Sequence, residues 1–159
     1  MNNRNNTSGK SIVLILLELL LGIGTIVGGA ALMMDPSGEA IGLPLSLIEN
    51  SWFTNYFVPG LILFMMLGVV PVIISVGLAK KTRSALAERL NVFQDWHWSW
   101  TFSLYSGFVL IMWIAIQAYI IHSFSMIHFM YIALGLAIQI VSLLPKVQDK
   151  YRRQEYISS

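Results

Sequence analysis

The chain has 159 residues, of which 56% are hydrophobic and only 11% are charged, with a formal net charge of +2. Soluble domains carry about 25% charged residues, so this composition excludes an ordinary soluble domain and favours a protein of the membrane. The chain has no cysteine, which excludes disulfide bonds, thiolate metal sites and cysteine nucleophiles.

Four apolar runs dominate the chain, and a helix needs about 20 apolar residues to cross a bilayer. They cover residues 12–34, 58–79, 100–121 and 126–144. The first is longer than the apolar part of a signal peptide, so we expect it to be retained as a helix. We predict an all-α membrane protein, a four-helix antiparallel transmembrane bundle formed by residues 11–145. Residues 1–10 are polar, which predicts a disordered N-terminus, and residues 146–159 form a polar tail, expected as a fraying continuation of the fourth helix.

All ten lysines and arginines fall on one side of this predicted topology. They precede the first run, lie between the second and third, or follow the fourth, whereas residues 35–57 and 122–125 contain none. The positive-inside rule therefore predicts that both termini are cytoplasmic. We expect a multi-pass protein of the plasma membrane with membrane lipids as partners, and attraction to anionic headgroups explains the basic residues without nucleic acid.

Glu18 is the charged residue within the first run, roughly 10 Å inside the inner boundary at 1.5 Å per residue. An ionised carboxylate there is costly, and no lysine or arginine lies at its depth, so we expect Glu18 to be neutral at pH 7 or reached by water. Polar residues at similar depth on later runs predict a cluster around it, made of Gln139, Ser103, Ser106, Tyr105 and Ser142. Two interpretations stay open: a proton-coupled or ligand-binding site, or hydrogen bonding that only fixes helix rotation, worth about 1 kcal/mol per contact.

Gly24 and Gly28, in the second half of the first run, form a GxxxG pair. Small residues at this spacing let two helices approach closely in lipid. The pair predicts either a seam between two copies of the chain or packing against another helix of the same chain. We favour the second interpretation, because a four-helix protein has many internal seams to fill.

Residues 35–57 connect the first two runs. Asp-Pro-Ser-Gly at 35–38 is a turn signal. Beyond it, Pro44 can open a short helix with Leu45, Ile48 and Trp52 on one face. This pattern predicts a helix in the outer interface or a cap folded over the bundle.

The segment 80–99 is basic and then aromatic. Leu86, Leu90 and Phe93 fall on one helical stripe, which predicts a brief amphipathic helix on the membrane surface. Asp95 is the expected cap of the third helix. Pro71, inside the second run, predicts a kink that is more often a static feature of a membrane helix than a hinge.

Motifs of known chemistry are missing from the sequence. It contains no nucleophile elbow, P-loop, zinc-protease motif or dinucleotide fingerprint. His122 and His128 flank the last turn without a nearby carboxylate, which is a weak metal signal. Gln117 is expected to bond a neighbouring helix. We therefore assign no catalytic, cofactor or metal residue and expect no enzyme.

Three short stretches carry a family resemblance: Asp-Pro-Ser-Gly at 35–38, Leu-Pro-Leu-Ser at 43–46 and Pro-Gly-Leu-Ile-Leu at 59–63, followed by Trp113 and Gln117. They resemble an uncharacterised family of small four-helix bacterial integral membrane proteins. The resemblance covers most of the chain between Leu16 and Pro145 and implies the span count but no activity. Small multidrug-resistance transporters are similar in a looser way, with four helices and a glutamate in the first, where Glu18 stands here.

Two functions follow as expectations. The first is a non-enzymatic accessory or structural membrane protein that acts through helix packing, with a second copy or another membrane protein as partner. The alternative is a small proton-linked transporter or a lipophilic-ligand-binding membrane protein that uses Glu18.

Overall fold

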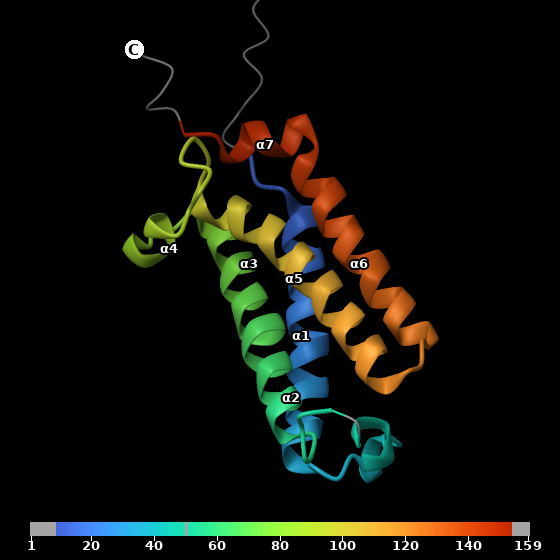
Figure 1. Ribbon diagram of the computed structural model, residues 1–159. Coiled ribbons are helices and arrows are strands. Elements are labelled where there is room, and N and C mark those ends of the chain that lie inside the picture. Colours follow the sequence, from blue (N-terminus) through green and yellow to red (C-terminus); the bar gives the residue numbers. More distant parts are fainter. Residues whose placement is uncertain (1–8, 50, 154–159) are drawn as a thin grey trace, which may run out of the picture.

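The computed structural model describes residues 9–49 and 51–153, and within these ranges the fold is built from helices (Figure 1). Four helical spans are long and apolar enough to cross a membrane: Ile12–Met34, Phe57–Lys80, Trp98–Ile121 and Met126–Leu143. Each boundary lies within two residues of the sequence-based expectation, so the four predicted apolar helices are confirmed. The expected disorder of residues 1–10 falls largely outside the described residues.

The second span is divided into three segments, and short helices occupy the connections. In chain order the elements are α1 (Ile12–Met34), η1 (Glu39–Ile41), η2 (Leu45–Ile48), α2 (Phe57–Ile62), η3 (Leu63–Val69), α3 (Val70–Lys80), α4 (Ala85–Arg89), α5 (Trp98–Ile121), α6 (Met126–Leu143) and α7 (Pro145–Tyr151).

The two ends of the bundle differ in composition (Figure 1). One end holds the start of α1, the end of α3, α4, the start of α5, the end of α6 and α7. Every lysine and arginine that the structure describes lies in these segments, so this end is named the basic end (residues 9–11, 80–97 and 144–153). The opposite end, named the loop end, comprises residues 35–49, 51–56 and 122–125.

α1 packs mainly against α2, η3 and α3, and less extensively against α6. Its buried positions recur every three or four residues, as expected for one helical face: Leu14, Glu18, Leu21, Gly22, Thr25, Gly29 and Leu32. The opposite face exposes large apolar side chains, among them Leu16, Leu20, Ile23 and Val27. Such a continuous apolar surface is suited to hydrocarbon rather than to water.

The middle of the second span, η3, is π-helical, immediately before Pro71. Proline lacks the N–H that a regular α-helix would donate to the carbonyl four residues earlier, here that of Leu67. The buried hydroxyl of Thr25 on α1 donates to this carbonyl, and also lies 2.8 Å from the carbonyl of Leu21 in its own helix. A neighbouring helix thus satisfies the group that proline leaves unpaired.

The connection between α1 and α2 folds back over the bundle. Pro44 is followed by the 3₁₀ helix η2 rather than an α-helix, and Ile48 is buried while Trp52 is exposed, so these two residues do not share a buried face. Ile48 and Tyr56 cluster with Leu32 at the end of α1, and the hydroxyl of Tyr56 donates to the carbonyl of Pro44 (3.2 Å). The loop therefore covers the end of α1.

Two expectations at the basic end are wrong. The cap of α5 is His97, whose Nδ1 accepts the N–H of Ser99, and not Asp95. The tail does not continue α6, because the chain turns at Leu144 and Pro145 opens a separate helix, α7. α7 packs back on the bundle through Val147 and Tyr151, both buried.

Candidate functional site

Glu18 is completely buried at the contact between α1 and α5. The hydroxyl of Ser106 on α5 donates to Glu18 Oε1 (2.7 Å) and also lies 2.9 Å from the carbonyl of Ser103. Glu18 Oε2 makes no hydrogen bond with the described residues. The arrangement joins two spanning helices through one carboxyl–hydroxyl contact.

The other residues of the expected polar cluster are placed differently. Ser103 faces Glu18, but its hydroxyl donates to the carbonyl of Ser99 in its own helix (2.9 Å). Gln139 on α6 lies against Gly107, the neighbour of Ser106, and its amide nitrogen has no hydrogen-bond partner in the described part of the chain.

The remaining two members take part in other contacts. The hydroxyl of Ser142 is buried without a described partner, while its carbonyl accepts the indole N–H of Trp100 (2.8 Å). Tyr105 is half-buried and its ring lies 5.6 Å from that of Phe102. The structure therefore brings Glu18 together with Ser106 and Ser103, and among the described residues it shows no hydrogen bond from Glu18 to Gln139, Ser142 or Tyr105.

The closest packing of α1 occurs at Gly22 and Gly29. A Cβ added to Gly29 would lie 2.7 Å from the carbonyl oxygen of Gly60, and one added to Gly22 would lie 2.7 Å from Val72 Cγ2. The facing residues Gly60 and Gly68 have similarly little space, against Leu32 and Ile26. These four glycines form the seam between α1 and the second span, named here the glycine seam.

The expected packing pair, Gly24 and Gly28, lies outside this seam. A Cβ at Gly28 would meet only Leu63 Cδ2, at 3.8 Å, and one at Gly24 would meet only the hydroxyl of Tyr131, at 3.1 Å. Both glycines instead line a cavity.

This cavity, named the loop-end cavity, has a volume of about 330 Å³. Its walls come from α1, the loop after α1, the start of η3, α5 and α6. They are mainly apolar, including Leu32, Leu43, Leu63, Leu110, Ile114 and Ile127. Polar side chains interrupt the apolar lining: Thr25, Gln117, His128 and Tyr131 on the helices, with Ser123 and Ser125 from the turn before α6. The sequence pointed to Gln117 only as a helix contact, and no spacing in it indicated that these residues from three helices enclose one space.

His128 is oriented by the start of α6. Its Nδ1 accepts the backbone N–H of Ser125 (3.0 Å), as part of a reciprocal cap. In a neutral ring the proton therefore lies on Nε2, which makes the other ring nitrogen a hydrogen-bond donor. Gln117 and Tyr131 supply further polar atoms to the cavity, so its wall can hydrogen-bond a ligand that is otherwise apolar.

Comparison with protein families, with curated proteins and with solved structures finds no match for this chain. Within the described residues, no group of three or more histidine, cysteine or acidic side chains is placed to hold a metal ion.

Proposed function

We propose that this chain is a non-enzymatic multi-pass membrane protein that binds a lipophilic molecule in the loop-end cavity. The observation that supports the proposal is the cavity itself: about 330 Å³ of mainly apolar space walled by residues of all four spans. Ligand sites in proteins are typically concave and apolar, with a few polar groups that fix the orientation of the ligand.

The chemistry of the lining favours a ligand with a hydrocarbon chain and a small polar group. Leucine and isoleucine side chains from α1, α5 and α6 offer dispersion contacts but no hydrogen bonds. Polar atoms gather near the loop end, where Ser123, Ser125 and His128 also line the space. A chain would therefore lie along the apolar walls with its polar group toward the loop end.

The membrane orientation is part of the same proposal. The one-sided placement of lysine and arginine supports an antiparallel bundle with the basic end and both termini in the cytoplasm. In that orientation the loop-end cavity lies in the outer half of the plasma membrane. The ligand would then come from the outer leaflet or from outside the cell.

We assign Glu18 to helix positioning rather than to transport. Its contact is an interhelical hydrogen bond to Ser106, and it does not line the loop-end cavity. Polar side chains buried between membrane helices commonly act in this way.

A photoreactive fatty acid tests the proposal by showing where a lipophile lies. The full-length protein in phosphatidylcholine nanodiscs is irradiated with a diazirine-labelled fatty acid, and the labelled residues are mapped by mass spectrometry. We expect labels on cavity residues such as Tyr131 and Gln117, and competition by unlabelled fatty acid. Labels spread evenly over lipid-facing residues such as Leu16 and Leu20, without competition, would contradict the proposal.

A further inference from the structure

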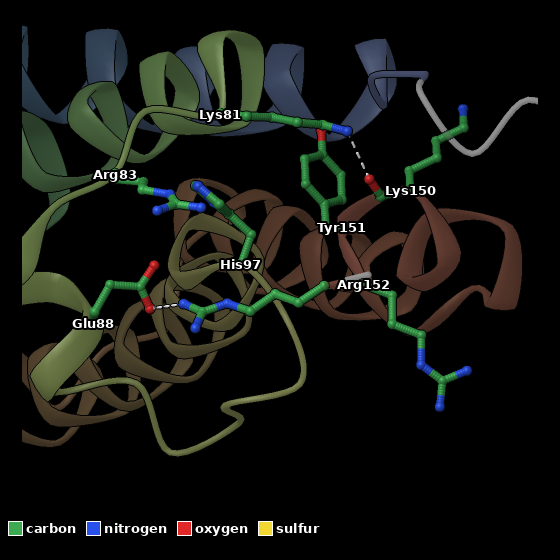
Figure 2. Close-up of a pocket in the computed structure, with 8 residues that line it drawn as sticks. Lys81, Arg83, Glu88, His97, Lys150, Tyr151 and Arg152 are labelled. Carbon is green, nitrogen blue, oxygen red and sulfur yellow. Dashed lines mark hydrogen bonds and ion pairs between the residues drawn. The ribbon is translucent and has the colours of Figure 1, made fainter. Parts of the chain in front are cut away.

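A second cavity lies at the basic end, at the opposite end of the bundle from the loop-end cavity. It has a volume of about 490 Å³ and is named the basic cavity. Three separate segments enclose it: the junction of α3 with α4, the start of α5 and the end of α7 (Figure 2). Its lining residues are Lys81, Arg83, Glu88, His97, Lys150, Tyr151, Arg152 and Arg153.

The charge of the basic cavity is unbalanced. Five lysines and arginines line it with one acidic residue, Glu88, which forms an ion pair with Arg153. Figure 2 shows that Lys81 and Arg83 extend along the cavity, whereas the charged groups of Lys150 and Arg152 point away from it. Burial lowers the pKa of Lys81, and the nearby charges of Lys10 and Lys150 lower it further. An anion that binds between these cations reduces the electrostatic repulsion among them.

The cavity is held in shape by hydrogen bonds between its three segments. The hydroxyl of buried Tyr151 accepts the N–H of Ser11 (3.1 Å) and lies 3.3 Å from the carbonyl of Leu78. The N–H of His97 donates to the carbonyl of Tyr151 (2.8 Å). α7 is thereby fixed to α1, α3 and α5, so the basic groups are positioned before any ligand arrives.

Lys81 is held in an unusual backbone conformation. It ends α3 with φ = 51°, in the left-handed region that non-glycine residues adopt infrequently. Its ammonium group donates to the carbonyl of Lys150 (2.8 Å) and lies 5.5 Å from the centre of the Tyr151 ring (Figure 2). A left-handed residue commonly ends a helix, and here its N–H donates to the carbonyl of Gly77.

His97 adds a neutral donor to the cavity wall. Its Nδ1 accepts the N–H of Ser99 (3.3 Å), so in the neutral ring the proton lies on Nε2. Nε2 is buried at the cavity wall, beside the backbone of Lys81. Burial lowers the pKa of His97, which favours this neutral form. The cavity thus combines fixed cations with a buried ring N–H.

We propose that the basic cavity binds a phosphate group, carried either by the headgroup of an anionic phospholipid or by a soluble phosphate compound. Guanidinium groups match phosphate oxygens with paired N–H donors, and ammonium groups add point charges. Basic pockets beside membrane helices bind anionic headgroups by the same chemistry. This site is independent of the loop-end cavity, so either proposal can fail alone.

The test compares Lys81→Gln with Lys80→Gln. Lys80 is adjacent, exposed and absent from the cavity lining, so the two variants lose the same charge at the same end of the bundle. One arm titrates inorganic phosphate into the protein in phosphatidylcholine nanodiscs and follows thermal unfolding. The other adds phosphatidylglycerol to the nanodiscs and counts retained phosphatidylglycerol by native mass spectrometry.

We expect Lys81→Gln to weaken phosphate stabilisation or phosphatidylglycerol retention by about tenfold, with Lys80→Gln within about twofold of wild type. An effect in the first arm identifies a soluble phosphate site, and an effect confined to the second identifies a headgroup site. Arg83→Gln, at an exposed position, should weaken binding as Lys81→Gln does. Lys81→Arg keeps the charge and should retain binding. Together these variants separate loss of charge from misfolding. Equal weakening by Lys80→Gln and Lys81→Gln, or no binding of either probe to wild type, would overturn the proposal.

Discussion

Two pairs of glycines on α1 have opposite structural roles. Gly22 and Gly29 face the second span so closely that an added Cβ would lie within 2.7 Å of a neighbouring heavy atom. Gly24 and Gly28, interleaved with them, border the loop-end cavity. The comparison teaches that a small residue in a membrane helix either admits another helix or leaves space for a ligand, depending on what faces it.

What faces each pair explains the difference. Opposite Gly22 and Gly29 the second span has its own glycines, Gly68 and Gly60, so the backbones can meet. Opposite Gly24 stands Tyr131 of α6, a large side chain whose hydroxyl limits the approach. Close packing therefore needs small residues on both helices. A GxxxG pair identifies small residues on one helix and says nothing about the helix that faces it.

Gly29→Val places a side chain in the glycine seam, where the packing is closest. It should have the largest effect on stability. Its side chain would collide with the carbonyl oxygen of Gly60 and the backbone nitrogen of Phe64, atoms that cannot move without shifting a helix. We expect a loss of about 3 kcal/mol in unfolding free energy, measured by SDS titration in mixed micelles.

The matched control is Gly28→Val, where the nearest atom to the new Cβ is 3.8 Å away. It should leave stability unchanged or slightly increased. Equal losses for Gly28→Val and Gly29→Val would show that the two pairs are not distinguished by packing.

Ser106→Ala tests the polar contact that joins α1 to α5. Removing the hydroxyl leaves the buried Glu18 carboxyl without its donor, and we expect a loss of about 1.5 kcal/mol in the same SDS titration. Ser75→Ala, which removes a buried hydroxyl bonded within its own helix, should cost less than about 0.5 kcal/mol. If Ser106→Ala costs as much in a Glu18→Leu background as in wild type, the Glu18 contact does not join the helices.

Thr25→Val tests the polar contact of the glycine seam while keeping the side-chain shape. The carbonyl of Leu67 would lose its donor from α1, at an expected cost of about 1 kcal/mol. In a Pro71→Ala background the restored backbone N–H can serve that carbonyl, so the same substitution should cost less. Unfolding free energies of the four proteins in this cycle provide the measurement, and a cost that does not depend on residue 71 would refute the role of Thr25.

The smallest effect is expected at His97, outside the spans, and depends on pH. Because burial lowers the pKa of His97 below its ordinary value of 6.5, the unfolded chain takes up a proton there at a higher pH than the folded chain does. The stability from the neutral ring is present above about pH 6.5 and is lost as the pH falls below it. The melting temperature should therefore drop between pH 7 and pH 5, and His97→Asn should reduce that slope.

The four spans could be predicted because length and hydropathy alone decide whether a helix can cross a bilayer. The burial of Glu18 also followed from its depth, and its contact with Ser106 joins two residues that the sequence placed at one level. Neither the glycine seam nor the loop-end cavity could be predicted, because both depend on how the helices are rotated against one another. The packing of α7 could not be predicted either, because a short polar tail has no periodic pattern that would indicate that Tyr151 is buried.

The most direct test of the central claim is the affinity of a fluorescent fatty acid for variants that fill the loop-end cavity. Gly28→Leu places a side chain in the cavity, whereas Val27→Leu changes an exposed, lipid-facing neighbour. Titration of the full-length protein in nanodiscs should give at least about tenfold weaker binding for Gly28→Leu, as expected for lost apolar contact area, with Val27→Leu close to wild type. Unchanged binding in Gly28→Leu, with the fold retained, would contradict the proposal that the cavity is the binding site.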